Sequence, residues 1–140
     1  MVNGFAILNV FPELLSFSFL APMILRIVLG VITLNLGLLK WKTERERWNL
    51  FFKGFGATES GVFVTLFALI EIIGGVALIL GLYTQMAALI FAVIGFVEIY
   101  AEYKESALVK RNITFYILLF AIALSLLFTG AGAYSLDLPL

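Results

Sequence analysis

The sequence predicts an all-α integral membrane protein, a four-helix bundle with an interfacial amphipathic segment between its first and second spans. Hydrophobic residues make up 63% of the chain and charged residues 13%, whereas a soluble domain has about 25% charged residues. The mean hydropathy is +1.12. With about 20 residues needed for each crossing, the chain has room for four spans but not for an additional soluble catalytic domain. We therefore expect one transmembrane domain over residues 1–140, with spans at about 22–40, 62–82, 85–101 and 113–129.

The residue types that are missing exclude several kinds of chemistry. The net charge is zero, so the basic surface that nucleic-acid binding requires is absent. Cysteine and histidine are both absent, which removes thiolate catalysis, the usual zinc sites, and haem bound through histidine or thiolate. No catalytic residue or metal site is predicted. A redox role would need a diffusible partner or carrier, which favours a subunit or accessory over a complete enzyme.

The first span is predicted at Pro22–Lys40 and contains one charge, Arg26. Residues 1–20 are apolar but interrupted, which indicates an interfacial lead-in with Pro12 as the first residue of a short helix. Alternatively, the span begins near Phe17 and is kinked at Pro22, which would place Arg26 about two turns deeper. Because a guanidinium in hydrocarbon costs several kcal/mol unless it finds a partner, Arg26 is a candidate functional residue.

The first connection, WKTERERWNLFFKGFGATES, alternates aromatic and charged residues. Trp41, Trp48, Phe51, Phe52 and Phe55 recur at intervals of three, four and seven, which predicts a helix with one aromatic face. Such a helix is typical of an anchor in the headgroup plane. The alternative is a docking surface for a soluble partner.

The second span holds Glu71 near its middle, and the following turn is so short that the third span must be its antiparallel neighbour. Glu98 and the charged and aromatic residues after it indicate the exit of the third span from the bilayer. In the fourth span Ala121, Ser125 and Thr129 fall four apart, a stripe of small residues that predicts close helix packing.

The distribution of positive charge predicts the orientation. Apart from Arg26, every Lys and Arg lies in the first or the third connection. The positive-inside rule therefore places both connections in the cytoplasm. We expect a multi-pass protein of the cell (inner) membrane with both termini extracytoplasmic.

This orientation places Arg26 and Glu71 in the outer half of the bilayer, where we expect their side chains to meet. Asp137, in the tail on the same side, could fold back over Arg26 as a second acid. One hypothesis is an outer-leaflet pocket in which Arg26, Glu71, Asn35 and Asp137 bind a carbonyl or anionic head group. The other is a closed cluster that only holds the helices in register. The sequence leaves both open.

Four stretches in this order, LRIVLG, NLGLLKW, EIIGGVALILGLYTQMAAL and LLFTGAGAYSLD, resemble the DoxX family of small four-helix membrane proteins. The resemblance runs from about Leu25 to Asp137. The chain departs from the family pattern in its long, aromatic and charged first connection. It also has Gln85 at the position where a basic residue often follows the threonine. The resemblance implies a four-helix bundle.

The resemblance implies a function only loosely. Relatives include membrane subunits linked to thiosulfate and quinone redox chemistry, others proposed to work beside detoxifying enzymes, and distant chaperone-like members. We expect a membrane module that binds a quinone-like or lipid-like molecule near Arg26 and Glu71. The alternative is a non-enzymatic interaction or assembly protein that works through residues 41–55. A small transporter would need oligomerisation. The expected partners are the lipid bilayer, a redox enzyme or other membrane protein, and a second copy of the chain.

Overall fold

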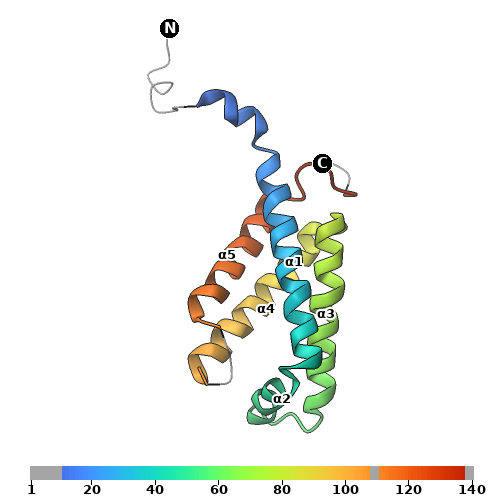
Figure 1. The fold of residues 1–140 in the computed structure, drawn as a ribbon, viewed down its shortest axis with the longest axis vertical. Coiled ribbons are helices and arrows are strands. Elements are labelled where there is room, and N and C mark those ends of the chain that lie inside the picture. The colour runs from blue at the N-terminus through green and yellow to red at the C-terminus, as the bar shows by residue number, and fades with distance from the viewer. Residues whose placement is uncertain (1–10, 108–110, 138–140) are drawn as a thin grey trace.

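A computed structural model describes residues 11–107 and 111–137. The first half of the predicted lead-in, Met1–Val10, and Lys110 of the third connection lie outside the described residues. The described part contains helices and no strand, in the order η1 (Pro12–Phe17), α1 (Leu20–Lys42), α2 (Arg45–Gly54), α3 (Ser60–Leu80), α4 (Thr84–Lys104) and α5 (Ile113–Thr129) (Figure 1). The predicted spans correspond to α1, α3, α4 and α5 to within one turn. The predicted helical bundle is confirmed.

The start of the first span lies between the two predicted alternatives. Pro12 begins the short helix η1, as its position suggested. Helix α1 then runs without interruption from Leu20. Pro22 lies within its first turn, where the backbone N–H groups have no partner inside the helix, so proline is tolerated there.

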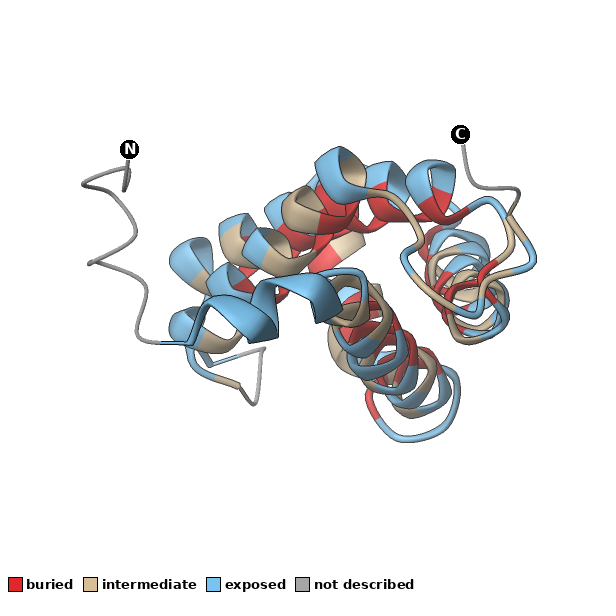
Figure 2. Ribbon diagram, turned by 90° about the horizontal axis from the view of Figure 1, so that it is seen from above, coloured by how far each residue is buried: buried red, intermediate tan, exposed pale blue. Residues whose placement is uncertain are grey.

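The outer faces of the bundle are apolar. Helices α1, α3 and α4 are long and apolar enough to cross a membrane, and the apolar helix α5 is shorter, with 17 residues. Exposed residues lie on the outward sides of the helices and buried residues face the centre (Figure 2). Large side chains such as Ile73, Phe96, Leu118 and Phe128 are exposed. Lipid tails are as apolar as these side chains. The chain is an integral, multi-pass membrane protein.

Helices α1 and α3 pack along stripes with alternating four- and three-residue spacing. The buried stripe of α1 includes Arg26, Gly30, Thr33, Gly37 and Lys40, and that of α3 includes Val64, Ala68, Glu71, Gly75 and Leu78. This spacing is typical of helices that cross at a shallow angle. A Cβ on Gly30 would lie 2.8 Å from the carbonyl oxygen of Gly75, so the two backbones touch. Close packing therefore uses these glycines. The prediction that another helix packs closely along the small-residue stripe of α5 is wrong, because Ala121 and Thr129 are exposed.

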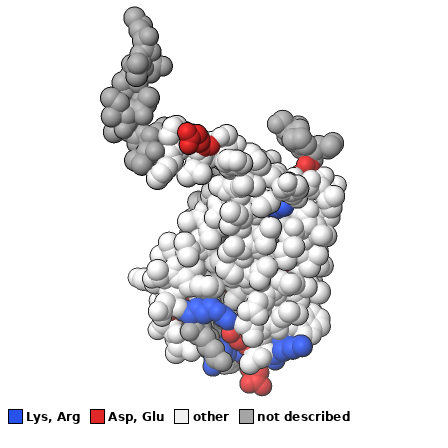
Figure 3. Space-filling model, turned by 45° about the horizontal axis from the view of Figure 1, so that its top comes forward, with Lys and Arg blue, Asp and Glu red and all other residues white. Residues whose placement is uncertain are grey.

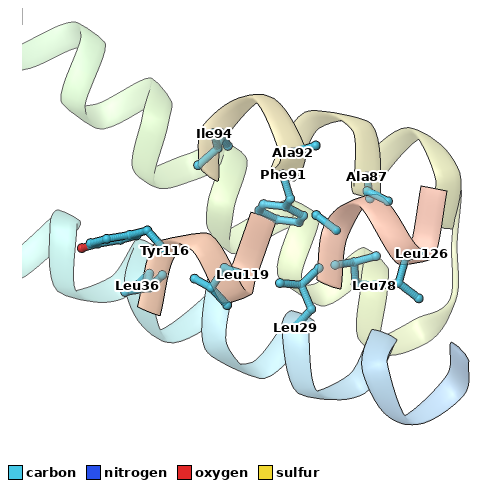
Figure 4. Packing of buried hydrophobic residues seen from close by; sticks show 12 residues of the cluster. Leu29, Leu36, Leu78, Ala87, Phe91, Ala92, Ile94, Tyr116, Leu119 and Leu126 are labelled. Carbon is cyan, nitrogen blue, oxygen red and sulfur yellow. The ribbon is translucent and has the colours of Figure 1, made fainter. Parts of the chain in front are cut away.

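The hydrophobic core lies where α4 and α5 pack against the α1–α3 pair (Figure 4). Leu29 and Leu36 from α1 and Leu78 from α3 meet Phe91 from α4 and Leu119 from α5. The core therefore joins the two helix pairs into one bundle.

Helix α2 occupies the predicted place between the first two spans, but its aromatic face turns toward the bundle. Trp48 and Phe51 are buried against Val64 and Ala101. A docking surface that uses Trp48 is therefore wrong, since this side chain belongs to a core. Most Lys and Arg side chains visible in Figure 3 gather at the end of the molecule that holds α2. Above them, the visible face is a broad zone almost without charged residues.

Candidate functional site

The tail after α5 crosses the end of the bundle opposite α2. The backbone N–H of Ala133 donates to the carbonyl of Phe19 at 3.1 Å, just before α1. The N–H of Asp137 donates to the carbonyl of Gly81 at 2.8 Å, in the turn between α3 and α4. The tail therefore connects the first, second and third spans at this end.

Asp137 caps the N-terminus of α4. Its Oδ1 accepts the N–H of Tyr83 at 2.6 Å, and its Oδ2 accepts the N–H of Thr84 at 2.7 Å. Partial burial raises the pKa of Asp137, but these hydrogen bonds and the positive charge of Arg26 outweigh that effect and lower the pKa below its ordinary value. A carboxylate at a helix N-terminus also benefits from the helix dipole.

Arg26 lies under this tail with 1% of its surface exposed. Its Nη2 donates to the carbonyl of Tyr134 at 3.1 Å and contacts that of Ala133 at 3.5 Å. Its Nε and Nη1 are buried and have no hydrogen-bond partner among the described residues. A Cβ on Gly81 would lie 2.0 Å from Nη1. Gly81 therefore makes room for the guanidinium.

An open cleft of about 670 Å³ lies between the tail and the start of α4. It is lined by Phe19, Tyr83, Thr84, Gln85, Met86, Thr129, Gly130, Ala131, Gly132, Ser135 and Asp137. The hydroxyl of Thr84 is buried and has no hydrogen-bond partner among the described residues. Unsatisfied buried polar atoms are rare and need an explanation.

An apolar groove of about 300 Å³ adjoins the cleft between α3 and α4. Tyr83 and Met86 line both spaces. The other lining residues are apolar or glycine, namely Ile70, Ile73, Gly74, Ala77, Leu82, Ala87, Ile90 and Phe91. The groove therefore continues the cleft along the lipid-facing side of the bundle.

A second polar cluster lies in the other half of the bundle, nearer to α2. The Nζ atom of Lys40 is 2.5 Å from Oε1 of Glu71 and 2.5 Å from Oε1 of Glu98. All three side chains are almost fully buried, at 1%, 0% and 2% exposure. They come from α1, α3 and α4, so one buried ammonium joins three spans.

Aromatic rings close this cluster toward α2. Lys40 Nζ lies 4.7 Å from the ring centre of Trp48 and 4.8 Å from that of Phe67. Cations at this distance are attracted by the negative face of an aromatic ring. The buried face of α2 therefore covers the charges and separates them from the surface.

A sequence model of the DoxX family matches residues 21–103, which is more than half of the chain. The chain belongs to the DoxX family. The match includes the Lys40 cluster and the start of α4, whereas the tail with Asp137 lies outside it. No curated protein and no solved structure matches the chain significantly.

The structure of this DoxX chain separates the four predicted site residues. Arg26 and Asp137 lie together at the tail, and the pKa of Asp137 reflects the charge of Arg26. The predicted contact of Arg26 with Glu71 is wrong, because Glu71 pairs with Lys40. Asn35 is exposed. It lies nine residues from Arg26, which is half a revolution of the helix, so it occupies the opposite face of α1.

Sequence reasoning missed three polar residues of these DoxX sites. In the sequence, Lys40 counts as a charge of the first connection, Glu98 is predicted to lie at a solvated helix end, and Thr84 lies in an uncharged turn. A signal for Lys40 was present, because Arg26, Thr33 and Lys40 are seven residues apart and so share one helix face. No comparable pattern indicated Thr84, since its partner segment is 53 residues away.

Proposed function

We propose that this DoxX protein binds a quinone-like or lipid-like amphiphile in the cleft at the tail and serves as a membrane module of a redox system. The observation that carries the proposal is the cleft itself, whose wall includes Thr84, a residue with a buried hydroxyl beside the Asp137 carboxylate that makes no hydrogen bond of its own in the described part of the chain. A bound carbonyl or hydroxyl would complete the hydrogen bonding of the Thr84 hydroxyl and recover about 1 kcal/mol or more.

The charges around the cleft favour a neutral head group. The carboxylate of Asp137 lines the cleft, and both of its oxygens are already occupied by backbone N–H groups. It would repel an anionic head. The buried Arg26 lies behind the tail, and its Nη1, like Ser135 of the cleft wall, lies against Gly81.

The adjoining groove favours a ligand with an apolar chain. Its lining carries almost no polar surface, and it opens on the lipid-facing side between α3 and α4. A head group in the cleft would direct a chain past Tyr83 and Met86 into this groove. Binding sites that are mostly apolar with a few placed polar groups are typical of such ligands.

The redox role rests on the family and on composition. The chain contains no cysteine and no histidine, so electrons would be carried by the bound molecule and exchanged with a partner redox enzyme or other membrane protein. A second copy of the chain is a further candidate partner. From the positive-inside rule we expect the cleft at the extracytoplasmic side of the inner membrane, in the outer leaflet.

The test is a thermal-stability titration of the protein in lipid nanodiscs. A short-chain benzoquinone should raise the melting temperature of the wild type in a saturable way, and Thr84→Val should weaken apparent binding by about tenfold, because one hydrogen bond to a buried group is lost. The matched control is Thr114→Val at an exposed threonine of α5, which should bind like the wild type. An anionic phospholipid with chains of similar length should give no saturable shift.

An equal rise in melting temperature on quinone addition for the wild type and for Thr84→Val would contradict the proposal, because the cleft would then not be the quinone-binding site. A second check is to fill the groove with a larger side chain. Ala77→Trp should weaken the binding of a long-chain quinone more than the binding of a quinone without a chain. Ala121→Trp on the exposed face of α5 should affect neither.

A further inference from the structure

We infer that Lys40, Glu71 and Glu98 form a proton-binding site within the membrane, separate from the ligand cleft. The geometry that supports this inference is one ammonium held at 2.5 Å by two carboxyl groups from different helices. The three side chains are buried and cross-link α1, α3 and α4 in the half of the bundle nearer to α2.

The charge balance requires a further positive charge. If both glutamates were ionised, one negative charge would stay uncompensated in a buried site, which costs several kcal/mol. The Oε2 atom of Glu71 is buried and accepts no hydrogen bond from the described residues. An unpartnered oxygen is far less costly on a neutral carboxyl group than on a carboxylate. One proton shared by the two glutamates leaves a neutral cluster.

The neighbouring elements do not supply that positive charge. Helix α2 contributes the Trp48 ring, and α3 also contributes the Phe67 ring. From α5, the buried Tyr116 lies within electrostatic range of Glu98. The nearby Arg111 is neutralised by Glu44 at 3.2 Å. Lys40 is therefore the one cation in contact with the two glutamates in the described part of the chain.

A row of carboxyl groups leads from this site to the charged end of α4. Glu98 is buried, Glu102 is half-buried and Glu105, just after the helix, is exposed. Positions four and seven residues apart lie on one helix face. The Oε2 of Glu102 is also buried without a partner among the described residues. Protons from the aqueous phase on the α2 side would reach Glu98 along this row.

Infrared spectroscopy of the wild-type protein in nanodiscs at neutral pH tests the inference. We expect the C=O stretching band of one protonated, buried carboxyl group, which shifts slowly on transfer to D2O. The band should disappear in Glu71→Gln and in Glu98→Gln, because the remaining glutamate then forms a neutral pair with Lys40. Glu46→Gln, at an exposed position in α2, should leave the band unchanged.

A second variant keeps the test decisive if a glutamine variant does not fold. Lys40→Met removes the cation, so both glutamates should be protonated and the band should double in intensity. Absence of the band in the wild type at neutral pH would overturn the inference. A band that stays unchanged in both glutamine variants would do the same, since it would then belong to another group.

Discussion

Asp137 in the C-terminal tail accepts the backbone N–H of Thr84 at 2.7 Å, although 53 residues separate the two in the chain. Helix α4 has no side-chain cap of its own, and the preceding Tyr83 has a positive φ of 49°. The cap that the short α3–α4 turn lacks is therefore supplied by the tail. The same contact holds the tail over Arg26 and forms one wall of the cleft.

Replacing Asp137 by alanine should destabilise the protein in a pH-dependent way. Loss of an N-cap carboxylate costs about 1 kcal/mol. Because the folded-state pKa of Asp137 lies below its unfolded value, its contribution is fully present above about pH 4 and is lost as the pH falls through the folded-state pKa. Unfolding of wild type and Asp137→Ala in mixed micelles, compared across acid pH, measures this difference. If the stability difference between the wild type and Asp137→Ala grew toward low pH, it would contradict the predicted direction of the pH dependence.

The contact of α1 with α3 should not tolerate a methyl group at Gly75. A Cβ there would lie 2.8 Å from the carbonyl oxygen of Gly30 and 2.8 Å from the backbone nitrogen of Leu34. Since backbone atoms cannot yield locally, the helices must separate, and Gly75→Ala should cost about 1–3 kcal/mol. The control is Gly54→Ala, where the Cβ would meet nothing within 4 Å. Denaturant titration that shows equal stability for both variants would refute the close approach.

The orientation of the protein can be tested with single cysteines, because the chain has none. An impermeant maleimide should label Ser18→Cys, between η1 and α1, in intact cells. It should label Thr58→Cys, between α2 and α3, only after the membrane is permeabilised. Both positions are exposed. The reverse pattern would place the cleft on the cytoplasmic side.

The spans could be predicted because each is a long apolar segment, and hydropathy alone identifies such segments. The packing of α2 could not, because an aromatic face at helical spacing suits both a membrane interface and a protein core. Trp48 in α2 is buried over Lys40, whereas Trp41, which belongs to the last turn of α1, is exposed. Only the way in which the first connection folds against α3 shows that the aromatic face of α2 belongs to a protein core and not to the membrane interface.

The partners of the charged residues were also beyond the sequence. Charge count placed Arg26 and Glu71 in one half of the bilayer, and proximity along the membrane normal suggested a pair. The structure pairs Glu71 with Lys40 because a lysine at the end of α1 reaches inward between α3 and α4. A long flexible side chain makes helix depth a poor guide to contact.

Photolabelling with a quinone analogue that carries a photoreactive group on its head ring tests the ligand site most directly. The account predicts saturable labelling of residues 83–86 or 129–137, which excess unlabelled quinone prevents and Thr84→Val reduces. Labelling that is spread over the exposed apolar faces, for example at Phe128, and that unlabelled quinone does not displace would contradict it.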